Sequence, residues 1–492
     1  MKGFISTFVL FCVVSFLSAQ TIYNQNTAVE KIVPQSPQTA SLFKYTEYPV
    51  SPATGIPEIQ VPIYTIECDG IQVPISISYH ASGIKVDDIA TPVGLGWTLN
   101  AGGAIGCSVL GIQDTHAESY LKSEDEVRNK LWNDKGGGFY HEMSDLISGD
   151  GTIDTQSDKY VYNFAGKTGS FRLNYDNMQF TPVPYTPLKM KEFSQGYKIT
   201  DSDGAEYYFL KSETTIINSA STNKYPTSSY YLSKIVTPSK KDSIIFSYDI
   251  ISNYSSLSLS SYQHDGMMWI PEDRENIVSW ERHFLHLKKI GIMETKLIKT
   301  IYSYSTPLLT SITWKNNKVS FNYLSNRLDR QKQRLNSIVI KNSIGDVVKS
   351  VDVCNNGYLG NSKKNYRMLL DSIRVYGTNS EEAEVYRFSY DMKPLPSYKD
   401  INDVDSYFCR EDYWGYYNGT SYATYIPDPY PCIPKNGGER VRGADRNPNS
   451  NTIQNGILKE ITYPTGGTSI FEYELNEANE LCGGIRVKSI TH

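Results

Sequence analysis

The chain has 492 residues and a formal net charge of −5, from 48 Lys and Arg against 53 Asp and Glu. A mildly acidic chain without a Lys/Arg stripe argues against nucleic acid or an anionic membrane as a partner. Its length leaves room for two or three domains with ample core. The 38 tyrosines, together with many Thr, Ser and Ile residues, favour strands, because these side chains suit a pleated and half-buried surface.

Residues 1–19 have the pattern of a secretory signal peptide. Lys2 supplies a positive start, Phe4–Leu17 an apolar run, and Ser18-Ala19 an end of small residues. The run is too short for a membrane span of about 20 residues, and no later segment is long and apolar enough to span a bilayer. We therefore expect an exported protein, located at the cell surface, outside the cell or in the periplasm.

Residues 20–110 are expected to form an N-terminal β region. Ile59–Ile63 and Val73–Tyr79 alternate apolar and polar residues on either side of Asp69-Gly70. This arrangement predicts a β-hairpin, and the prolines within both runs suggest edge positions.

A glycine-rich loop follows, with one tryptophan at its centre. We expect a packed structural loop with Trp97 buried, since a phosphate-binding loop requires a G-x-G-x-x-G spacing that is broken here. The glycines of this structural loop are Gly94, Gly96, Gly102 and Gly103.

Residues 111–150 differ from the β pattern and predict a helical insert. Within Ser119–Asp134 the apolar residues fall on one helical face with charged residues opposite, and Gly136–Gly138 would end the helix. His141-Glu142 starts like the zinc-protease motif H-E-x-x-H, but the second histidine is absent. We therefore expect no metal and no cofactor.

Residues 151–400 predict a series of antiparallel hairpins. Asp201–Gly204 is read as one of their turns, because the glutamate that a calcium loop needs at its twelfth place is missing. An internal repeat consists of Leu-x-x-Ile, a turn, and Phe-x-Tyr. A fifth copy opens with Leu335 and Ile338 and returns to Val351. The four full copies are Leu232/Ile235 with Phe246/Tyr248, Leu309/Ile312 with Phe321/Tyr323, Leu370/Ile373 with Phe388/Tyr390, and Leu458/Ile461 with Phe471/Tyr473. Single hairpins are marginal in water, so neighbouring copies must stack.

Residues 401–450 form a tyrosine-rich loop. Aromatic rings beside carboxylates are typical of sugar-binding sites, and the adjacent acids Glu411 and Asp412 raise the question of glycoside hydrolysis. Neighbouring acids on a strand point in different directions, whereas hydrolysis needs carboxyl groups facing each other across a bond. We expect structural packing of this loop, with glycan contact as the alternative. The candidate contact residues are Tyr413, Trp414, Tyr416 and Tyr417.

Six cysteines remain once residues 1–19 are removed, which permits three disulfides in an oxidising compartment. No C-x-x-C or His/Cys cluster suggests a metal site. Cys409 and Cys432 lie near the two ends of the tyrosine-rich loop and are the expected disulfide pair.

Residues 451–492 carry the last full copy and then Ile485–Ile490, which repeats the opening half of the unit. Val487 and Ile490 take the Leu and Ile places, and only Thr491 and His492 follow. We expect an unfinished strand with a row of unpaired N–H and C=O groups. The expectation is that the product is part of a longer shell, or that a partner strand pairs with it by β-augmentation.

The ordered set of motifs resembles the Rhs/YD-repeat proteins of Bacteroidetes type, and is also similar to toxin-complex B subunits. The resemblance runs from about Gly55 to the end, although the strict Y-D-x-x-G-R-L spelling is absent. Its motifs are Ser78–Gly83 (S-Y-x-x-S-G), Gly94–Leu99 (G-L-G-W-x-L), Asp412–Gly419 (D-Y-W-G-Y-Y-N-G), Gly443–Arg446 (G-A-D-R) and Tyr463–Gly467 (Y-P-T-G-G).

This resemblance implies an all-β fold, an array of antiparallel β-hairpins forming a shell, with an N-terminal β-sandwich-like region and one short inserted helix. It implies a non-enzymatic role in a surface or secreted toxin or effector assembly, or in cell contact. The implied partners are proteins: a C-terminal shell continuation, a cargo or a neighbouring chain. The competing expectation is a carbohydrate-binding or glycoside-cleaving surface protein.

Overall fold

The computed structural model describes residues 55–108, 120–121, 153–154, 158–174, 177–193, 195–218, 223–224, 227–264, 294–378, 382–427, 443–477 and 481–492. Apart from one 3-10 turn at Val404–Tyr407, the elements in these ranges are strands. The predicted all-β class is confirmed. Within the same ranges no helix is long and apolar enough to span a membrane.

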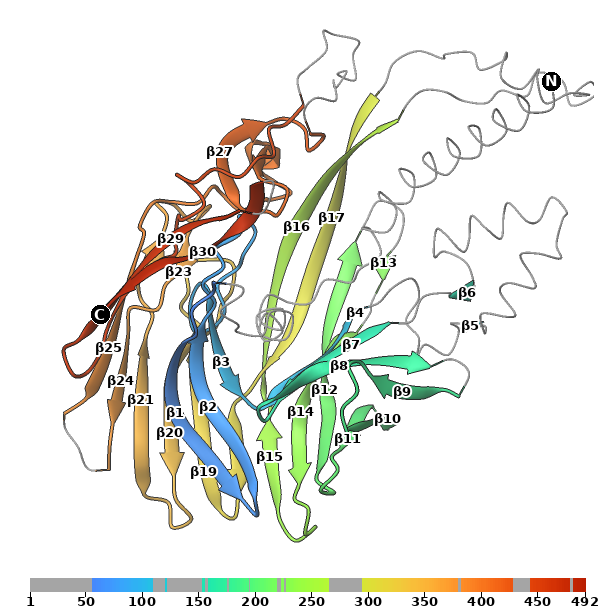
Figure 1. Cartoon of the computed structure of the whole chain (residues 1–492), viewed down its shortest axis with the longest axis vertical. Helices are drawn as coiled ribbons and strands as arrows, with labels where there is room; N and C mark the ends of the chain where they lie inside the picture. Colours follow the sequence, from blue (N-terminus) through green and yellow to red (C-terminus); the bar gives the residue numbers. More distant parts are fainter. Residues whose placement is uncertain are drawn as a thin grey trace, which may run out of the picture.

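A small antiparallel sheet is built from the N-terminal region (Figure 1). It contains β1 (Ile59–Cys68), β2 (Ile71–Tyr79) and β3 (Trp97–Ala101). The predicted hairpin is present, with Asp69 and Gly70 at its turn and positive φ values of 48° and 81°. Two successive positive φ angles match the turn to the twist of the flanking strands.

A sheet of 21 strands forms most of the remaining fold. Along the repeat region its strands pair antiparallel in one long series, which makes a curved wall in Figure 1. The series is β10 (Lys189–Phe193), β11 (Gly196–Thr200), β12 (Glu206–Asn218), β14 (Thr227–Val236), β15 (Ser243–Ser247), β18 (Ser311–Trp314), β19 (Asn317–Leu324), β20 (Arg334–Lys341), β21 (Val347–Cys354), β24 (Ser372–Tyr376), β25 (Glu384–Tyr390), β28 (Leu458–Thr462), β29 (Thr468–Glu477) and β30 (Leu481–Thr491).

Two branches leave this series. One runs from β14 through β4 (Gly103–Ser108), β7 (Lys159–Phe164) and β8 (Lys167–Asn174) to β9 (Gln179–Pro182). The other is a tall hairpin of β16 (Ile250–His264) and β17 (Glu294–Leu308), joined to β12 through β17. Short pairs complete the set: β5 (Tyr120–Leu121) with β6 (Ile153–Asp154), β13 (Asn223–Lys224) with β12, β22 (Tyr358–Leu359) with β23 (Arg367–Met368), and β26 (Cys409–Glu411) with β27 (Tyr417–Tyr422).

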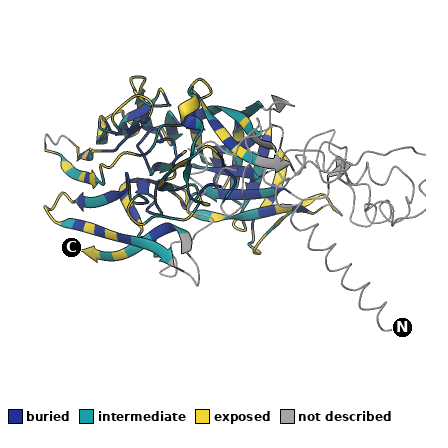
Figure 2. Ribbon diagram, turned by 90° about the horizontal axis from the view of Figure 1, so that it is seen from above, coloured by how far each residue is buried: buried dark blue, intermediate teal, exposed yellow. Residues whose placement is uncertain are grey.

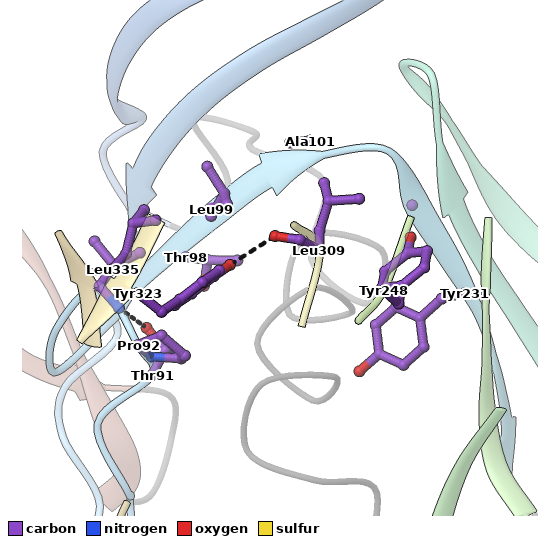
Figure 3. A pocket seen from close by; sticks show the side chains of 12 residues that line it. Thr91, Pro92, Thr98, Leu99, Ala101, Tyr231, Tyr248, Leu309, Tyr323 and Leu335 are labelled. Carbon is purple, nitrogen blue, oxygen red and sulfur yellow. Dashed lines mark hydrogen bonds between the residues drawn. The ribbon is translucent and has the colours of Figure 1, made fainter. Parts of the chain in front are cut away.

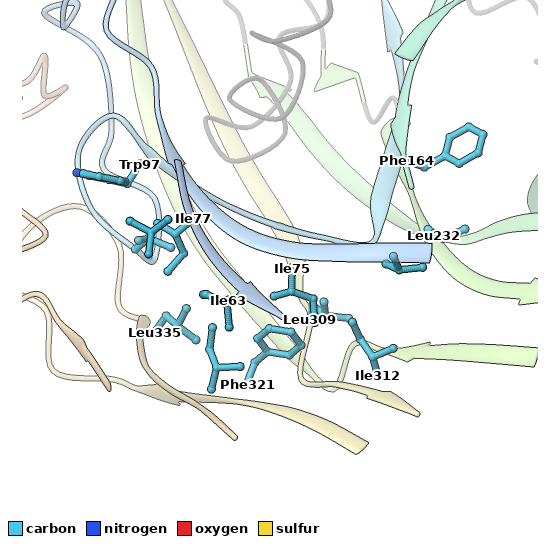
Figure 4. Close-up of a cluster of buried hydrophobic side chains, with 14 of the residues drawn as sticks. Ile63, Ile75, Ile77, Trp97, Phe164, Leu232, Leu309, Ile312, Phe321 and Leu335 are labelled. Carbon is cyan, nitrogen blue, oxygen red and sulfur yellow. The ribbon is translucent and has the colours of Figure 1, made fainter. Parts of the chain in front are cut away.

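The main core lies between the small sheet and the wall. Ile63 and Ile75 of the small sheet face Leu309, Phe321 and Leu335 of the wall (Figure 4). Many strands alternate buried and exposed residues, as Figure 2 shows along the edge of the molecule, because successive side chains point to opposite faces. The N-terminal region thus supplies one layer, the small sheet, and the strands of the wall supply the other.

The inserted helix was expected over Ser119–Asp134. Only Tyr120 and Leu121 of that segment are described, and they form β5 rather than a helical turn. The rest of the expected helix lies outside the described residues.

Candidate functional site

Trp97 joins the small sheet to the wall. Its side chain is fully buried, as the sequence predicted, and its indole N–H donates to the Tyr390 hydroxyl at 2.7 Å. The ring centroid lies 4.5 Å from that of Phe388 and 5.2 Å from that of Tyr79. A buried tryptophan needs a partner for its N–H, and here the partner belongs to a repeat unit almost 300 residues away in the sequence.

The glycines of the loop permit close approach. Gly96 has a φ of 74°, and a Cβ there would lie 2.6 Å from the Tyr79 ring. At Gly103 a Cβ would lie 2.3 Å from the Asn163 carbonyl oxygen of β7. Larger residues cannot occupy such positions without moving the backbone. Gly94 and Gly102 lie against the Leu370 backbone and the Phe246 ring respectively.

The same loop bonds to the wall through a buried ion pair. Arg327 Nη2 lies 2.7 Å from Asp329 Oδ2, and neither side chain is exposed. The guanidinium also donates to the carbonyl oxygens of Ala90 and Thr91 in the loop. Asp329 accepts the Met368 amide at 3.0 Å. The pair therefore ties the loop to the segment that follows β19 and to β23.

A small cavity of about 50 Å³ lies beside this loop (Figure 3). Tyr231 and Tyr248 line one side of it, and Tyr323 and Leu335 line the other. Pockets for small-molecule ligands usually enclose roughly 300–1,000 Å³. The cavity is therefore too small to suggest a binding site of that kind.

The full copies of the repeat share one hydrogen bond that the sequence pattern alone did not predict. In every full copy, the tyrosine of Phe-x-Tyr donates its hydroxyl to the carbonyl of the leucine that opens the same copy. The bonds are Tyr248 to Leu232 (2.8 Å), Tyr323 to Leu309 (3.0 Å), Tyr390 to Leu370 (2.7 Å) and Tyr473 to Leu458 (2.9 Å). Burial raises the pKa of all four tyrosines, so each hydroxyl keeps its proton.

The fifth copy obeys the same rule with a different donor. Val351 lies opposite Ile338, so Val353 and Asn355 stand where the other copies carry Phe and Tyr. Asn355, fully buried, donates its side-chain amide to the Leu335 carbonyl at 3.1 Å. The opening carbonyl thus has a side-chain donor in all five copies, which fits the rule that buried polar groups are hydrogen-bonded.

Tyr323→Phe should lower the free energy of unfolding by about 1–2 kcal/mol, because it removes the donor and leaves the Leu309 carbonyl without this hydrogen bond. Chemical denaturation monitored by fluorescence measures the change. Tyr185→Phe at an exposed position is the control and should have no effect. Equal stability of the two variants would show that the hydroxyl contributes nothing.

The tyrosine-rich segment is held together by the residues of its own motifs. Asp412 Oδ1 accepts the amides of Trp414 (2.8 Å) and Tyr416 (2.9 Å), which forms the turn of D-Y-W-G-Y-Y-N-G. Arg446, the last residue of G-A-D-R, donates to the Asp412 carbonyl at 2.7 Å. Asn418 donates to the Asp445 carbonyl at 2.8 Å. The two motifs therefore bind each other.

The four candidate glycan contacts are separated by this turn. Tyr413 and Trp414 are 56% and 42% exposed, whereas Tyr416 is buried and Tyr417 is half-buried. The rings of Tyr413 and Trp414 meet at 83°, so they do not share one flat face. Glycan contact through Tyr413 and Trp414 stays a prediction, and Tyr416 is not available for it.

The adjacent acids are committed to internal partners. Lys399 Nζ lies 2.6 Å from Asp87 and 3.4 Å from Glu411. Burial alone would lower the pKa of Lys399, but the two carboxylates outweigh burial and raise it. Burial raises the pKa of Glu411 and of Asp412. Since Glu411 faces Lys399 and Asp412 faces backbone amides, the pair does not form the opposed carboxyl groups of a glycosidase. Within the described ranges no group of three metal-ligating side chains occurs.

The expected Cys409–Cys432 disulfide stays a prediction, because Cys432 lies outside the described residues. Cys409 is fully buried, and burial raises the pKa of its thiol. A bridge here should stabilise the protein by about 2–4 kcal/mol through loop closure. Peptide mapping without reductant should recover the two cysteines in one linked peptide, and free thiols at both positions would contradict the pairing.

The last strand, β30, was expected to have an unpaired outer edge, and part of that edge is hydrogen-bonded. β30 pairs along its length with β29, and its outer side is partly occupied: Ile485 N–H donates to the Ser82 carbonyl and Val487 N–H to the Gly55 carbonyl, at 3.2 and 2.8 Å. The sequence did not predict these bonds, because the accepting carbonyls of Gly55 and Ser82 are about 400 residues before β30 in the chain. Beyond Val487, β29 is the one strand paired with β30 among the described residues.

The core face of the wall is open at this edge. Ile490 lies opposite Phe471 on β29, so both side chains are on the same face of the sheet. Phe471 is buried, whereas Ile490 is 40% exposed. An exposed apolar side chain next to a sheet edge marks a surface where another strand can add.

No protein-family model matches the chain, and no curated protein matches it. Solved structures to which it is similar include a crystal structure of TcdB2-TccC3 without the hypervariable C-terminal region, at 11% identity and a TM-score of 0.31. Another is TcdB2-TccC3-TEV, at 11% identity and a TM-score of 0.32. The matches cover 68% and 74% of this chain but 16% of each solved chain. The Bacteroidetes type and the YD repeats stay predictions.

Proposed function

We propose that the chain is a non-enzymatic structural protein, a β-sheet wall that joins another polypeptide at the edge of β30. The observation that carries this proposal is the open core face at Ile490, next to a strand whose outer side is unoccupied by described residues beyond Val487. In this role the chain would be the N-terminal part of a shell in a surface or secreted toxin or effector assembly, or in cell contact.

The buried acidic side chains have partners within the protein, which supports a role without catalysis. Buried carboxylates such as Asp329 and Glu411 have cationic partners, and Asp412 holds a turn. Buried charges of this kind are tied to structure rather than presented to a substrate. Export rests on the pattern of residues 1–19, which lie outside the described residues, and belongs to the proposal.

The edge can be tested with two isoleucines of similar exposure. Ile490 and Ile470 are 40% and 44% exposed, on adjacent strands and opposite faces. Residues 20–492 should associate increasingly with concentration in sedimentation velocity, because open strand edges template pairing. Ile490→Lys should reduce this association and Ile470→Lys should leave it unchanged. A wild-type protein that stays monomeric at the highest concentration, and behaves like both variants, would contradict the proposal.

A further inference from the structure

A lysine is buried between two carboxylates where the N-terminal region meets the tyrosine-rich segment. Lys399 Nζ lies 2.6 Å from Asp87 Oδ2 and 3.4 Å from Glu411 Oε2. The lysine side chain is 6% exposed, and Lys399 is the one buried lysine in the part of the chain that the structure describes. Desolvation of an ammonium is costly even when it is paired, so this site differs from an ordinary surface ion pair.

The backbone on both sides of Asp87 is held by hydrogen bonds. The Val86 amide donates to the Gly415 carbonyl at 2.9 Å. The Asp88 carbonyl accepts the Tyr398 hydroxyl at 3.3 Å. The Asp87 carboxyl group is therefore held against the lysine, and fixed positions of two reacting groups supply much of the rate of a reaction between them.

The other two side chains are also positioned by their surroundings. The Lys399 carbonyl accepts a guanidinium N–H of Arg330 at 3.1 Å, and Glu411 is paired with Tyr417 of β27. The ring of Tyr425, a buried residue, has its centroid 5.3 Å from Lys399 Nζ. This ring keeps water away from one side of the nitrogen, which favours reaction between the protein groups.

Glu411 gives the ammonium protons a place to go. In the resting protein the lysine is charged, because Asp87 and Glu411 raise the pKa of Lys399 in spite of its burial. Burial raises the pKa of Glu411, which makes its carboxylate a better base toward the ammonium. The neutral amine that results is a nucleophile. A small population of neutral amine is sufficient, because each molecule has to react once.

We propose that Lys399 and Asp87 condense to an intramolecular isopeptide bond, with Glu411 as the proton carrier. Lys399 Nζ forms a bond to Asp87 Cγ, and one Cγ–O bond of the carboxyl group breaks. Glu411 transfers two protons in turn from the nitrogen to the departing oxygen, which leaves as water. The ion pair thus becomes one amide and one water molecule, without any oxidant, reductant or other reactant. The Asp87 side chain is 44% exposed, which leaves the water a path to solvent.

The bond would cross-link two distant parts of the chain. Asp87 lies in the loop between β2 and β3, and Lys399 is 312 residues later. A cross-link over so long a loop restricts the unfolded chain and thereby favours the folded state. Unlike a disulfide, an amide is not broken by a reductant. This inference goes beyond the proposed function and does not depend on the edge of β30.

Intact-mass spectrometry of the mature protein, reduced and denatured after purification, tests the bond. The wild type should be lighter than its sequence by the mass of one water molecule. A tryptic digest should contain one branched peptide that includes both Asp87 and Lys399. In the presence of reductant, the wild type should unfold at a higher temperature than Lys399→Arg, which keeps the charge but has no reactive amine.

Three variants test the roles of the side chains. Lys399→Arg and Glu411→Gln should both have the full mass of their sequences, because the first lacks the nucleophile and the second cannot carry protons. Circular dichroism shows whether each variant is folded. Lys364→Arg is the matched control, since Lys364 lies 2.8 Å from Asp403 in an exposed ion pair, and this variant should keep the cross-link.

The wild-type mass decides the inference even if a variant does not fold. A wild type with the full mass of its sequence would overturn it. Loss of one water without a branched peptide, or persisting in Lys399→Arg, would also overturn it, because an aspartate before a glycine, such as Asp69, can lose water by cyclising onto its own backbone. A cross-link that still forms in Glu411→Gln would show that Glu411 is not the proton carrier.

Discussion

Trp97→Ala should lower the free energy of unfolding by about 3–5 kcal/mol, the range for truncating a large buried aromatic side chain. The ring fills the space between Tyr79 and Phe388, and its N–H bonds to Tyr390. Its removal leaves a cavity and takes away one bond between the small sheet and the wall. Equilibrium denaturation in urea followed by circular dichroism measures the loss.

Trp414→Ala provides the matched control, because this tryptophan is partly exposed and lies over Gly483. We expect a clearly smaller change in its denaturation midpoint. If the two alanine variants lose the same stability, the anchoring role of Trp97 is refuted.

Arg327→Met should be equally damaging, at about 3–5 kcal/mol, because removing one member of a buried ion pair leaves the other charge uncompensated. Asp329 would keep only the Met368 amide among the partners described above, and the carbonyls of Ala90 and Thr91 would lose their donor. Urea denaturation at neutral pH measures the effect.

The double variant Arg327→Met/Asp329→Leu tests the reason for that loss. It should recover part of the stability, since an apolar replacement of both charges removes the uncompensated carboxylate. The exposed Lys393, 3.9 Å from Asp391, gives a surface control, and Lys393→Met should leave the midpoint unchanged. A double variant less stable than Arg327→Met would show that Asp329 contributes independently of its charge partner.

Local patterns were sufficient to predict much of the wall. The alternation of apolar residues in each Phe-x-Tyr segment placed these side chains on one face, and the turn at Asp69-Gly70 could be predicted from two residues. Both features depend on neighbours in sequence, which is why they can be read without a structure.

Contacts between distant segments were not accessible in the same way. Neither Arg327 nor Asp329 was singled out from the sequence, yet both are buried beneath the Trp97 loop. Asn355 takes the tyrosine position of the fifth copy, four places after Val351, where the return strand of that copy was expected to end. Tyr416, a candidate contact under the glycan alternative, is buried, because the Asp412 turn directs its ring onto Gly83, where a Cβ would lie 2.8 Å away. For the buried ion pair, the one signal in the sequence was that Arg327 and Asp329, two opposite charges two places apart, come shortly after the strand that carries Tyr323.

The bond from each tyrosine hydroxyl to a leucine carbonyl also separates strand register from turn length. Register is fixed at the end of the hairpin away from the turn, so the turn can lengthen without moving the paired residues. The described copies already differ in this respect: two residues separate Trp314 from Asn317, whereas six separate Val236 from Ser243. Such a wall can accept new sequence at its tips, and so acquire new surfaces, while the spacing of its strands stays constant.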